Sequence, residues 1–503
     1  MRTKLAFTSR GTIDRALFAA RLTLVTVLCA AIAIPSTASP QSQSPSQSDD
    51  EVARIVGYSF TRSGALAFLE TLTDAIGGRI TGSPGSREAA ELILKTLKDA
   101  GFDSAHFEEY DLHSSWQHAS ATGEILSPVR RPLLIGTYGW APGTPGPVEV
   151  PVMDFGPPGN GDAPIPPSVR GAAVIIDLHS NAVSSTYVGA RVIIARRLAA
   201  AGAAAVFIVS DKPDRMLYTS AFGFYPRAPL PVLSIPAEDA ALIRRLLAHG
   251  AVKLRLDVQN SFPGPVKERN VVAEIKGAAD PGEIVLLTAH FDDWDPAQGA
   301  NDNGAGVAVI LAAARVFKLL HIRPKNTIRF VFFSGEEELS NGSRAYAAQH
   351  QDELDRTRAV FNIDSGAHPP LGFDIHGRID TEAASKKLLS SLAPLGADHV
   401  YLNADFDSDQ ETFIVEGVPI YSLHNAPSDY DTRHHTIIDT FERVDPRMLQ
   451  LQTAVMALAA YSFANAAERP GPRLNPTQVQ ELLKRTGLEQ LYRLEYSIPD
   501  NPK

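Results

Sequence analysis

The sequence predicts an α/β fold, namely a three-layer α/β/α sandwich around a mixed, mostly parallel sheet, with an inserted β-rich domain. From about residue 270 to 468, near-continuous apolar runs typical of strands covered on both faces alternate with segments of helical periodicity. Between about residues 128 and 265, shorter apolar runs alternate with turns rich in Pro and Gly. The chain of 503 residues is 44% hydrophobic and 21% charged, which indicates a globular protein of more than one domain.

The main α/β region contains four expected strands and several expected helices. Strands are expected at 283–290, 327–334, 359–364 and 418–424. Helices are expected at about 304–318, 343–349, 382–392 and 448–464, with two more between about 63 and 101 and a last one at about 477–492. The loop GGRITGSPGS separates the two early helices, and one helix at about 188–201 interrupts the β-rich segment.

The N-terminal segment has the order of a secretory signal. Five basic residues precede the apolar run 22–34, and the small residues Ser36, Thr37 and Ala38 follow it. We therefore expect cleavage near Ala38 and a secreted or periplasmic protein, with residues 39–55 as a flexible spacer. A membrane anchor is the alternative, although the run is short for a span. Cys29 suggests a lipoprotein, but bulky Leu28 precedes it where a small residue is needed.

The charge and cysteine content exclude several classes of function. The formal charge is −10, and removal of residues 1–38, with five basic residues and one acidic residue, lowers it to about −14. An acidic chain has no electrostatic attraction to nucleic acid, so no nucleic-acid partner is expected. Because Cys29 is the only cysteine, the processed chain has no disulfide and no thiolate ligand. Nitrogen and oxygen must hold any metal.

Acidic residues and histidine follow three of the expected strands. The first strand ends at His290 with Asp292 just after it, the second leads into Glu336 and Glu337, and the third ends at Asp364. Ligands of open α/β sheets bind outside the carboxyl ends of the strands, so these side chains are expected at one rim. Each alone has a simpler explanation, such as a helix cap or a turn, but the joint placement favours a site.

Two further segments complete a metal-binding set. Asp302 lies in the Gly-rich turn GANDNGAG before a helix, and His434 and His435 lie in DTRHHTIIDT. Two imidazoles and three carboxylates suit a pair of zinc ions about 3.5–4 Å apart, because a carboxylate can bridge both. Adjacent glutamates can then act separately, one as ligand and one as base. Asp292 is placed to hold the far ring nitrogen of His290.

Five segments resemble the blocks of the co-catalytic zinc exopeptidases, a family that includes secreted bacterial aminopeptidases and the carboxypeptidase Q group. The segments are HFDDWDPAQGANDNG, FFSGEEE, NIDSG, SDQETFIVEGVP and HHTIIDT. The D-x-W-D-x-x-Q-G-A form of the first block and the early GGRITGSPGS loop resemble the carboxypeptidase Q group in particular. The segment 128–265 is similar to a protease-associated domain, so the peptidase domain would comprise 56–127 and 266–468, followed by a helical tail at 469–503.

The resemblance implies a role for each candidate residue and two Zn²⁺ ions per chain. His290 and Asp364 would be terminal ligands of one ion, Glu337 and His435 of the other, and Asp302 would bridge them. Glu336 would be the general base and then the general acid. His435 is preferred over His434 because the family has His, three residues, and then Asp-Thr, as at Asp439. The resemblance also suggests a homodimer.

The expected activity is hydrolysis of a terminal residue from peptides, and an aminopeptidase or dipeptidase is favoured. A carboxypeptidase is the alternative and would need cations such as Arg433 at the substrate carboxylate. Two other hypotheses stay open. One is a noncatalytic receptor-like module on the same scaffold, and the other is a single-zinc acyl transferase similar to glutaminyl cyclase.

Overall fold

The computed structural model describes residues 47–156, 164–178, 184–222, 227–294 and 296–496. The expected signal segment and its cleavage site lie outside the described residues. Within the described ranges, no helix combines the length and apolar character that crossing a bilayer requires. Helix α1 (Gln47–Thr61) begins inside the expected spacer, so residues 47–55 are helical. Ile55 is fully buried in the main core, and this burial explains why the segment is ordered.

One continuous sheet path runs through the described chain, in the order β13-β12-β14-β11-β9-β10-β8-β4-β5-β6-β7-β3. The strands are β1 (His106–Ser127), β2 (Arg131–Leu133), β3 (Gly136–Thr137), β4 (Val148–Gly156), β5 (Ala173–Ile176), β6 (Ala205–Ser210), β7 (Val232–Pro236), β8 (Lys253–Ile275), β9 (Asp280–His290), β10 (Asn326–Phe333), β11 (Thr357–Asn362), β12 (Pro370–Asp374), β13 (His399–Tyr401) and β14 (Ile420–Asn425).

The four expected strands of the main region are present as β9, β10, β11 and β14. Strand β9 pairs in parallel with β10 and β11, and β11 pairs in parallel with β14. The antiparallel pairs β8–β10 and β12–β14 make the sheet mixed. This arrangement, with helices on both faces, confirms the predicted α/β fold. Strands β12 and β13 were not expected, because they are short and carry polar residues that hide an apolar run.

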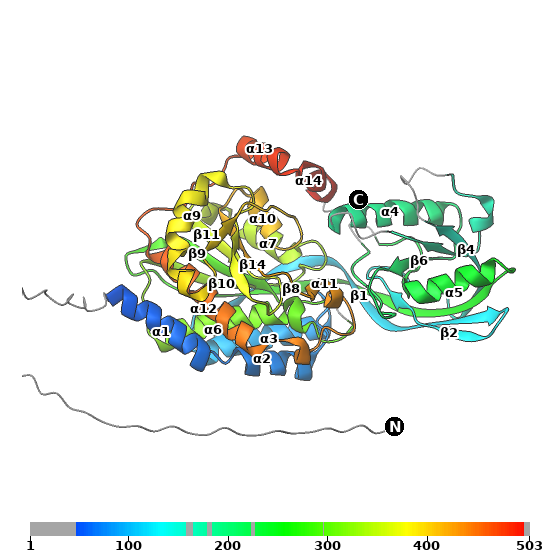
Figure 1. The fold of residues 1–503 in the computed structure, drawn as a ribbon, viewed down its shortest axis with the longest axis horizontal. Helices are drawn as coiled ribbons and strands as arrows, with labels where there is room; N and C mark the ends of the chain where they lie inside the picture. The colour runs from blue at the N-terminus through cyan, green and yellow to red at the C-terminus, as the bar shows by residue number, and fades with distance from the viewer. Residues whose placement is uncertain (1–46, 157–163, 179–183, 223–226, 295, 497–503) are drawn as a thin grey trace, which may run out of the picture. The chain divides into compact units, whose positions relative to one another are not determined.

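Helices cover both faces of this region (Figure 1). The helices of the described chain are α1, α2 (Ala65–Thr71), α3 (Pro84–Asp99), α4 (Ser184–Ala200), α5 (Ala237–Leu247), α6 (Ala305–Leu319), α7 (Asn341–Gln349), α8 (Gln351–Leu354), α9 (Glu382–Leu389), α10 (Gln410–Val415), α11 (Tyr430–Arg433), α12 (Pro446–Asn465), α13 (Pro476–Thr486) and α14 (Glu489–Tyr496). Of these, α4 and α5 lie beside strands β4 to β7 and not on the main region (Figure 1). Short turns are η1 (Leu72–Ile76), η2 (Pro167–Val169), η3 (Ala300–Gly304), η4 (Ile379–Thr381), η5 (Ser390–Leu395) and η6 (Phe441–Arg443). The expected C-terminal helix is two helices, because Gly487 adopts a left-handed conformation at φ 81 and ends α13.

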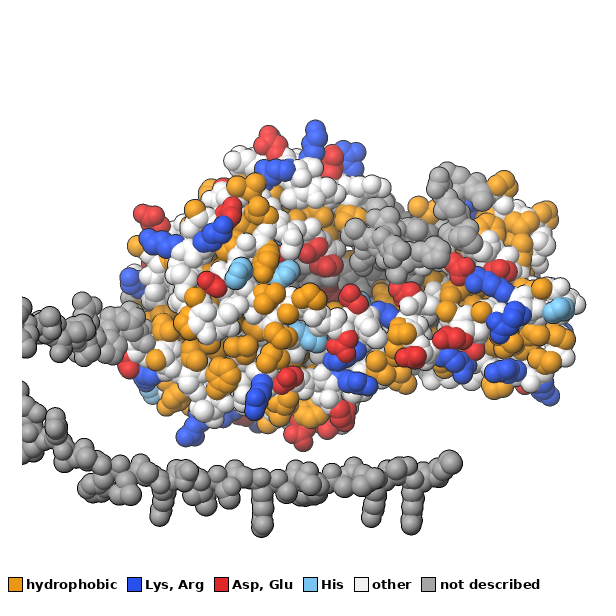
Figure 2. Space-filling model, viewed as in Figure 1, with side chains coloured by type: hydrophobic (Ala, Val, Ile, Leu, Met, Phe, Trp, Pro, Cys, Tyr) orange, Lys and Arg blue, Asp and Glu red, His pale blue; other side chains and the backbone are white. Residues whose placement is uncertain are grey.

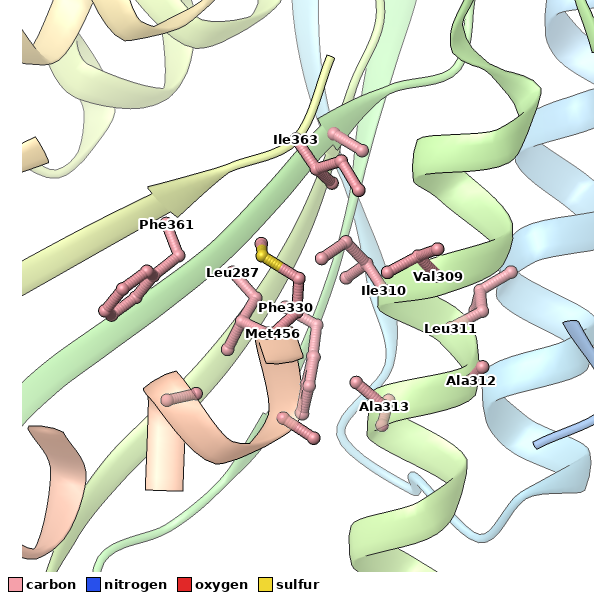
Figure 3. Close-up of a cluster of buried hydrophobic side chains, with 14 of the residues drawn as sticks. Leu287, Val309, Ile310, Leu311, Ala312, Ala313, Phe330, Phe361, Ile363 and Met456 are labelled. Carbon is pink, nitrogen blue, oxygen red and sulfur yellow. The ribbon is translucent and has the colours of Figure 1, made fainter. Parts of the chain in front are cut away.

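The main core lies between the sheet and helices α6 and α12. Leu287 of β9 and Phe330 of β10 are fully buried beside Met456 of α12 and Ile310 of α6 (Figure 3). A separate buried cluster lies on the opposite face and includes residues of α10, α13 and α14. The sheet is therefore covered on both sides, which explains why its strands are almost uniformly apolar.

Strands β1 and β8 form a long antiparallel ribbon that joins the main region to the segment expected as an insert. Their pairing runs from His106↔Val272 to Ser127↔Lys253. At one end β8 also pairs with β10, and at the other it pairs with β4. We call residues 128–252, beyond this ribbon, the insert region. The expected boundary at 265 thus falls inside β8, and the protease-associated assignment stays a prediction.

The insert region has its own parallel strands, β4 to β7, with cores on both faces. All three tryptophans of the protein meet beside it. Trp116 of β1, Trp140 of the insert region and Trp294 of the loop after β9 have ring centroids 5.6 to 6.2 Å apart. This tryptophan cluster connects the insert region to the segment that follows His290.

Candidate metal centre

Three adjacent strands deliver candidate ligands to one edge of the sheet. Because β10, β9 and β11 are parallel neighbours, their carboxyl ends lie together. His290 is the last residue of β9, Glu336 and Glu337 follow β10, and Asp364 follows β11. His290 Nε2 lies 3.3 Å from Asp364 Oδ1 and 4.0 Å from Glu336 Oε2.

Asp302 lies at the centre of the cluster, with its two carboxylate oxygens facing different histidines. Its Oδ1 is 3.4 Å from His290 Nε2, and its Oδ2 is 3.3 Å from His435 Nε2. The Asp302–Asn303 peptide bond is cis, and both residues are buried in η3 at the start of α6. One carboxylate between two imidazoles is the arrangement that a ligand bridging two cations requires.

The structure brings both His434 and His435 to Asp302. His434 Nε2 is 3.4 Å from Asp302 Oδ2, so His434, His435 and Asp302 form one group of close ligand atoms, and His290, Asp302 and Asp364 form another. His435 is better placed, because its Nε2 is also 2.9 Å from Glu337 Oε2. Its side chain is 8% exposed, compared with 31% for His434. The geometry thus supports the choice of His435.

Glu336 and Glu337 point to different parts of the cluster. Glu337 contacts His435, whereas Glu336 lies on the His290 side and its side chain is 12% exposed. The loop that carries them begins at Gly335, at φ +72, where an added Cβ would lie 2.6 Å from the Tyr110 hydroxyl. Glycine is therefore required for the close turn that separates the two side chains.

Asp292 lies beneath His290, as expected. Its Oδ1 is 3.6 Å from His290 Nδ1, and its backbone carbonyl is 3.2 Å from the same nitrogen. Its Oδ2 accepts hydrogen bonds from the Thr81 hydroxyl at 2.8 Å and from the Glu337 backbone N–H at 3.2 Å. Asp292 therefore connects three segments and leaves Nε2 of His290 facing the cluster.

Burial and charge shift the pKa values of the clustered groups strongly. Burial opposes the charged form of His290, but Asp364 and Glu336 raise its pKa well above the ordinary value. Burial raises the pKa of Glu337 to about 7, although His435 opposes this shift. Burial also raises the pKa of Glu336 well above its ordinary value. Such shifts are frequent at functional sites, where charge is concentrated out of water.

Several residues that support the centre were not identified from the sequence. The Arg79 backbone and side chain both contact Asp293, at 2.8 and 3.0 Å, and the guanidinium also donates to the carbonyl oxygens of Phe291, Gln298 and Gly299. Asp439 accepts from the backbone N–H groups of Asn301 and Asp302, at 2.8 and 3.0 Å. These contacts join segments more than 130 residues apart, so local spacing gave no signal for them.

The donor set fits zinc. Buried atoms without a hydrogen-bond partner among the described residues include His290 Nε2, Asp364 Oδ1 and Glu337 Oε1, which all belong to the cluster. Buried polar atoms are normally paired, so an additional group is expected to bind them. Imidazole nitrogen and carboxylate oxygen are the ligands that zinc accepts in the absence of thiolates.

Residues 270–460, which contain this whole cluster, match the model of peptidase family M28. This part of the chain is therefore similar to the M28 peptidases. Mouse carboxypeptidase Q is 28% identical over 416 residues, which cover 80% of this chain and 85% of the relative. The resemblance inferred from the sequence blocks is therefore confirmed, and the matches support a metallo-exopeptidase.

Solved structures agree with this assignment. A peptidase M28 precursor from Shewanella amazonensis superposes with a TM-score of 0.75 at 28% identity, covering 85% of this chain and 98% of that one. A zinc aminopeptidase from Bacillus subtilis gives a TM-score of 0.63 at 22% identity, covering 80% and 95%. The first structure extends the similarity beyond residues 270–460, since its match covers 85% of this chain.

Proposed function

We propose that this protein is a dizinc exopeptidase that removes N-terminal residues from peptides. The observation that carries the proposal is Asp302, whose two oxygens face His290 on one side and His435 on the other. Asp364 completes the first group of ligands, and Glu337 completes the second. Two zinc ions held there would polarise the scissile carbonyl and acidify the attacking water.

Glu336 is the proposed proton carrier. Its carboxylate lies beside His290 without being the closest group to either imidazole, so it remains available for a proton. Its raised pKa brings proton transfer nearer to neutral pH than an ordinary glutamate allows. Glu336 would accept the proton of the attacking water and transfer it to the leaving amine. Asp292 acts through His290 by fixing the orientation of its ring.

The charge around the cluster supports action at the N-terminus. The ion pairs at the candidate centre join the carboxylates of Asp302, Asp364 and Glu337 to imidazoles. This environment suits the α-ammonium of a peptide better than its carboxylate. Arg433, the expected cation for a carboxypeptidase, is already bonded to Asp429 and to the carbonyl of Arg443.

The first test is zinc-dependent release of the N-terminal residue from dipeptides and aminoacyl nitroanilides. We expect two zinc ions per chain, and Glu336→Gln should lower kcat by about 10²- to 10⁴-fold while both ions stay bound. Glu382→Gln, on the surface of α9, is the matched control and should keep full activity. Full activity of Glu336→Gln would contradict the mechanism.

Blocked peptides decide the direction of cleavage. Acetylation of the substrate N-terminus should abolish turnover, whereas amidation of its C-terminus should be tolerated. The opposite pattern would establish the carboxypeptidase alternative, which the similarity to carboxypeptidase Q favours. One zinc ion per chain would instead favour the single-zinc acyl transferase, and bound zinc without any peptide cleavage would favour a noncatalytic module.

A further inference from the structure

The two candidate histidine ligands are held in different ways. His290 has its far nitrogen, Nδ1, beside Asp292, the usual way in which a ligand imidazole is oriented. The corresponding nitrogen of His435, Nδ1, is buried and has no hydrogen-bond partner among the described residues. The backbone of His435 is left-handed, at φ 58, a conformation that is uncommon for residues other than glycine. Carboxylates thus hold this ring only through Nε2, at 2.9 Å from Glu337 and 3.3 Å from Asp302, and a contact on the face of the ring would add to its orientation.

That contact comes from the insert region. The ring of Tyr218 stacks on the imidazole of His435, with centroids 5.5 Å apart and planes inclined by 23°. The next residue, Thr219, donates its backbone N–H to the carbonyl of His435 at 3.4 Å. The imidazole of His434 stacks on that of His435, with ring centroids 3.8 Å apart. The rings of Tyr218, His434 and His435 therefore form one cluster.

A third residue of the same loop holds Tyr218 in place. The Lys212 ammonium lies 5.2 Å from the centroid of the Tyr218 ring, and it donates to the backbone carbonyl of Asp431 in α11. The loop thus contacts both α11 and the histidines that follow it. Burial lowers the pKa of Lys212, in agreement with an enclosed position rather than a solvated one.

We propose that Tyr218 is a positioning residue for the metal centre, so that the insert region completes the site of the second zinc ion. The proposal rests on the proposed function only in requiring that the centre binds zinc. Tyr218 acts through His435 by restricting rotation of its ring, whose Nδ1 has no hydrogen-bond partner among the described residues. Removal of the Tyr218 ring should therefore weaken the binding of the zinc ion at His435 and leave the binding of the ion at His290 unchanged.

The experiment measures zinc affinity rather than activity, by competition with a chromophoric chelator in the full chain. Tyr218→Ala should lower the affinity for one of two zinc ions by about 10- to 100-fold, the usual effect of losing a group that orients a ligand. Tyr218→Phe keeps the stacked ring and should retain both affinities. Tyr218→Leu keeps the bulk without the ring and should lose affinity, which separates orientation from simple loss of packing.

Tyr401→Ala is the matched control, because Tyr401 stacks on His424 with centroids 4.1 Å apart and His424 is not a candidate ligand. It should leave both affinities unchanged. Unchanged affinities in Tyr218→Ala and Tyr218→Leu would overturn the proposal. So would an equal loss in Tyr218→Phe, which would assign the effect to the hydroxyl, or an equal loss in Tyr401→Ala. Failure of the wild-type protein to bind zinc would instead reject the proposed function.

Discussion

At the scale of single residues, the centre depends on how each carboxylate divides its oxygens between partners. Asp302 faces one histidine with each oxygen, and Asp292 has one carboxylate oxygen 3.6 Å from His290 Nδ1 while the other accepts from the Thr81 hydroxyl. Asp439 supports the backbone that carries Asp302. Neutral substitutes of the same size can therefore test each role separately, because they alter the oxygens and not the packing.

Asp439→Asn should destabilise the protein by about 1–3 kcal/mol, because one oxygen that accepts N–H groups becomes a donor. Asn301 donates through both its backbone and its side chain, each at 2.8 Å, to the same oxygen of Asp439. Chemical denaturation measures the effect. Asp445→Asn is the control, because Asp445 caps α12 through Arg447 N–H and Asn caps a helix equally well. Equal stability of the two variants would contradict this role of Asp439.

Zinc affinity should fall as the pH falls below about 7. In the metal-free protein the pKa of Glu337 is raised to about 7, so below that pH a proton competes with the metal for this carboxylate, in addition to the competition at His290, whose pKa is also raised. Each such group weakens binding by up to about tenfold per pH unit below its pKa. Chelator competition between pH 5.5 and 8 measures the trend. A constant affinity across this range would show that Glu337 does not bind the metal.

At the scale of elements, the centre is assembled by parallel strands and then secured by loops from elsewhere. Strands β10, β9 and β11 place their carboxyl ends together. The segment after β9 is then held by Arg79, which donates to the carbonyl of Phe291, and by the tryptophan cluster. The tryptophan cluster also includes Trp140 of the insert region. Changes at this cluster should therefore affect the loop after His290 as well as the insert region.

Gly139→Ala should destabilise the protein by about 1–3 kcal/mol through overpacking. The added Cβ would lie 1.9 Å from Cη2 of Trp294, so the tryptophan or the backbone must move. Denaturation gives the stability, and tryptophan fluorescence should report the same change, since all three tryptophans lie in this cluster. Gly57→Ala in helix α1 is the control, because an added Cβ there meets nothing within 4 Å. Similar stability of both variants would contradict close packing at Gly139.

At the scale of the whole molecule, two features connect the insert region to the candidate metal centre. They are the β1–β8 ribbon and the contact of Tyr218 with His435. The described residues between 47 and 496 form one compact unit, and β8 pairs with β10 at one end of the ribbon and with β4 at the other. Acidic and basic side chains are interspersed on the face drawn in Figure 2. Several carboxylates meet at the buried candidate centre.

Removal of zinc should lower the melting temperature, because the metal offsets the repulsion among these buried carboxylates. A ligand present at 100 times its Kd stabilises the native state by about 2.7 kcal/mol per site. Scanning calorimetry with and without a chelator measures the difference, and restored zinc should restore the melting temperature. The Asp302→Asn variant should show little response to the chelator. An unchanged melting temperature of the wild-type protein would contradict a structural contribution of the metal.

The sequence by itself determined the α/β class, the four central strands and the family, because uniformly apolar runs and the residues that follow them are local signals. It also predicted the candidate site residues, since His290 ends a strand and Glu336, Glu337 and Asp364 each follow one. Only the tertiary structure showed that Asp302 faces both His290 and His435. It also showed that His435 contacts Glu337 as well as Asp302. Adjacent histidines look equivalent in one dimension, and their orientation depends on the fold.

The roles of Arg79, Asp439 and Tyr218 were likewise decided by tertiary structure. Each acts on a residue more than 130 positions away, through a hydrogen bond or a ring contact that leaves no periodic pattern. Helix α1 also depends on packing, because its segment is mostly polar and Ile55 is fully buried in the main core. Local sequence thus specifies strands and donor atoms, whereas the distances between donors arise from contacts that only the folded chain makes.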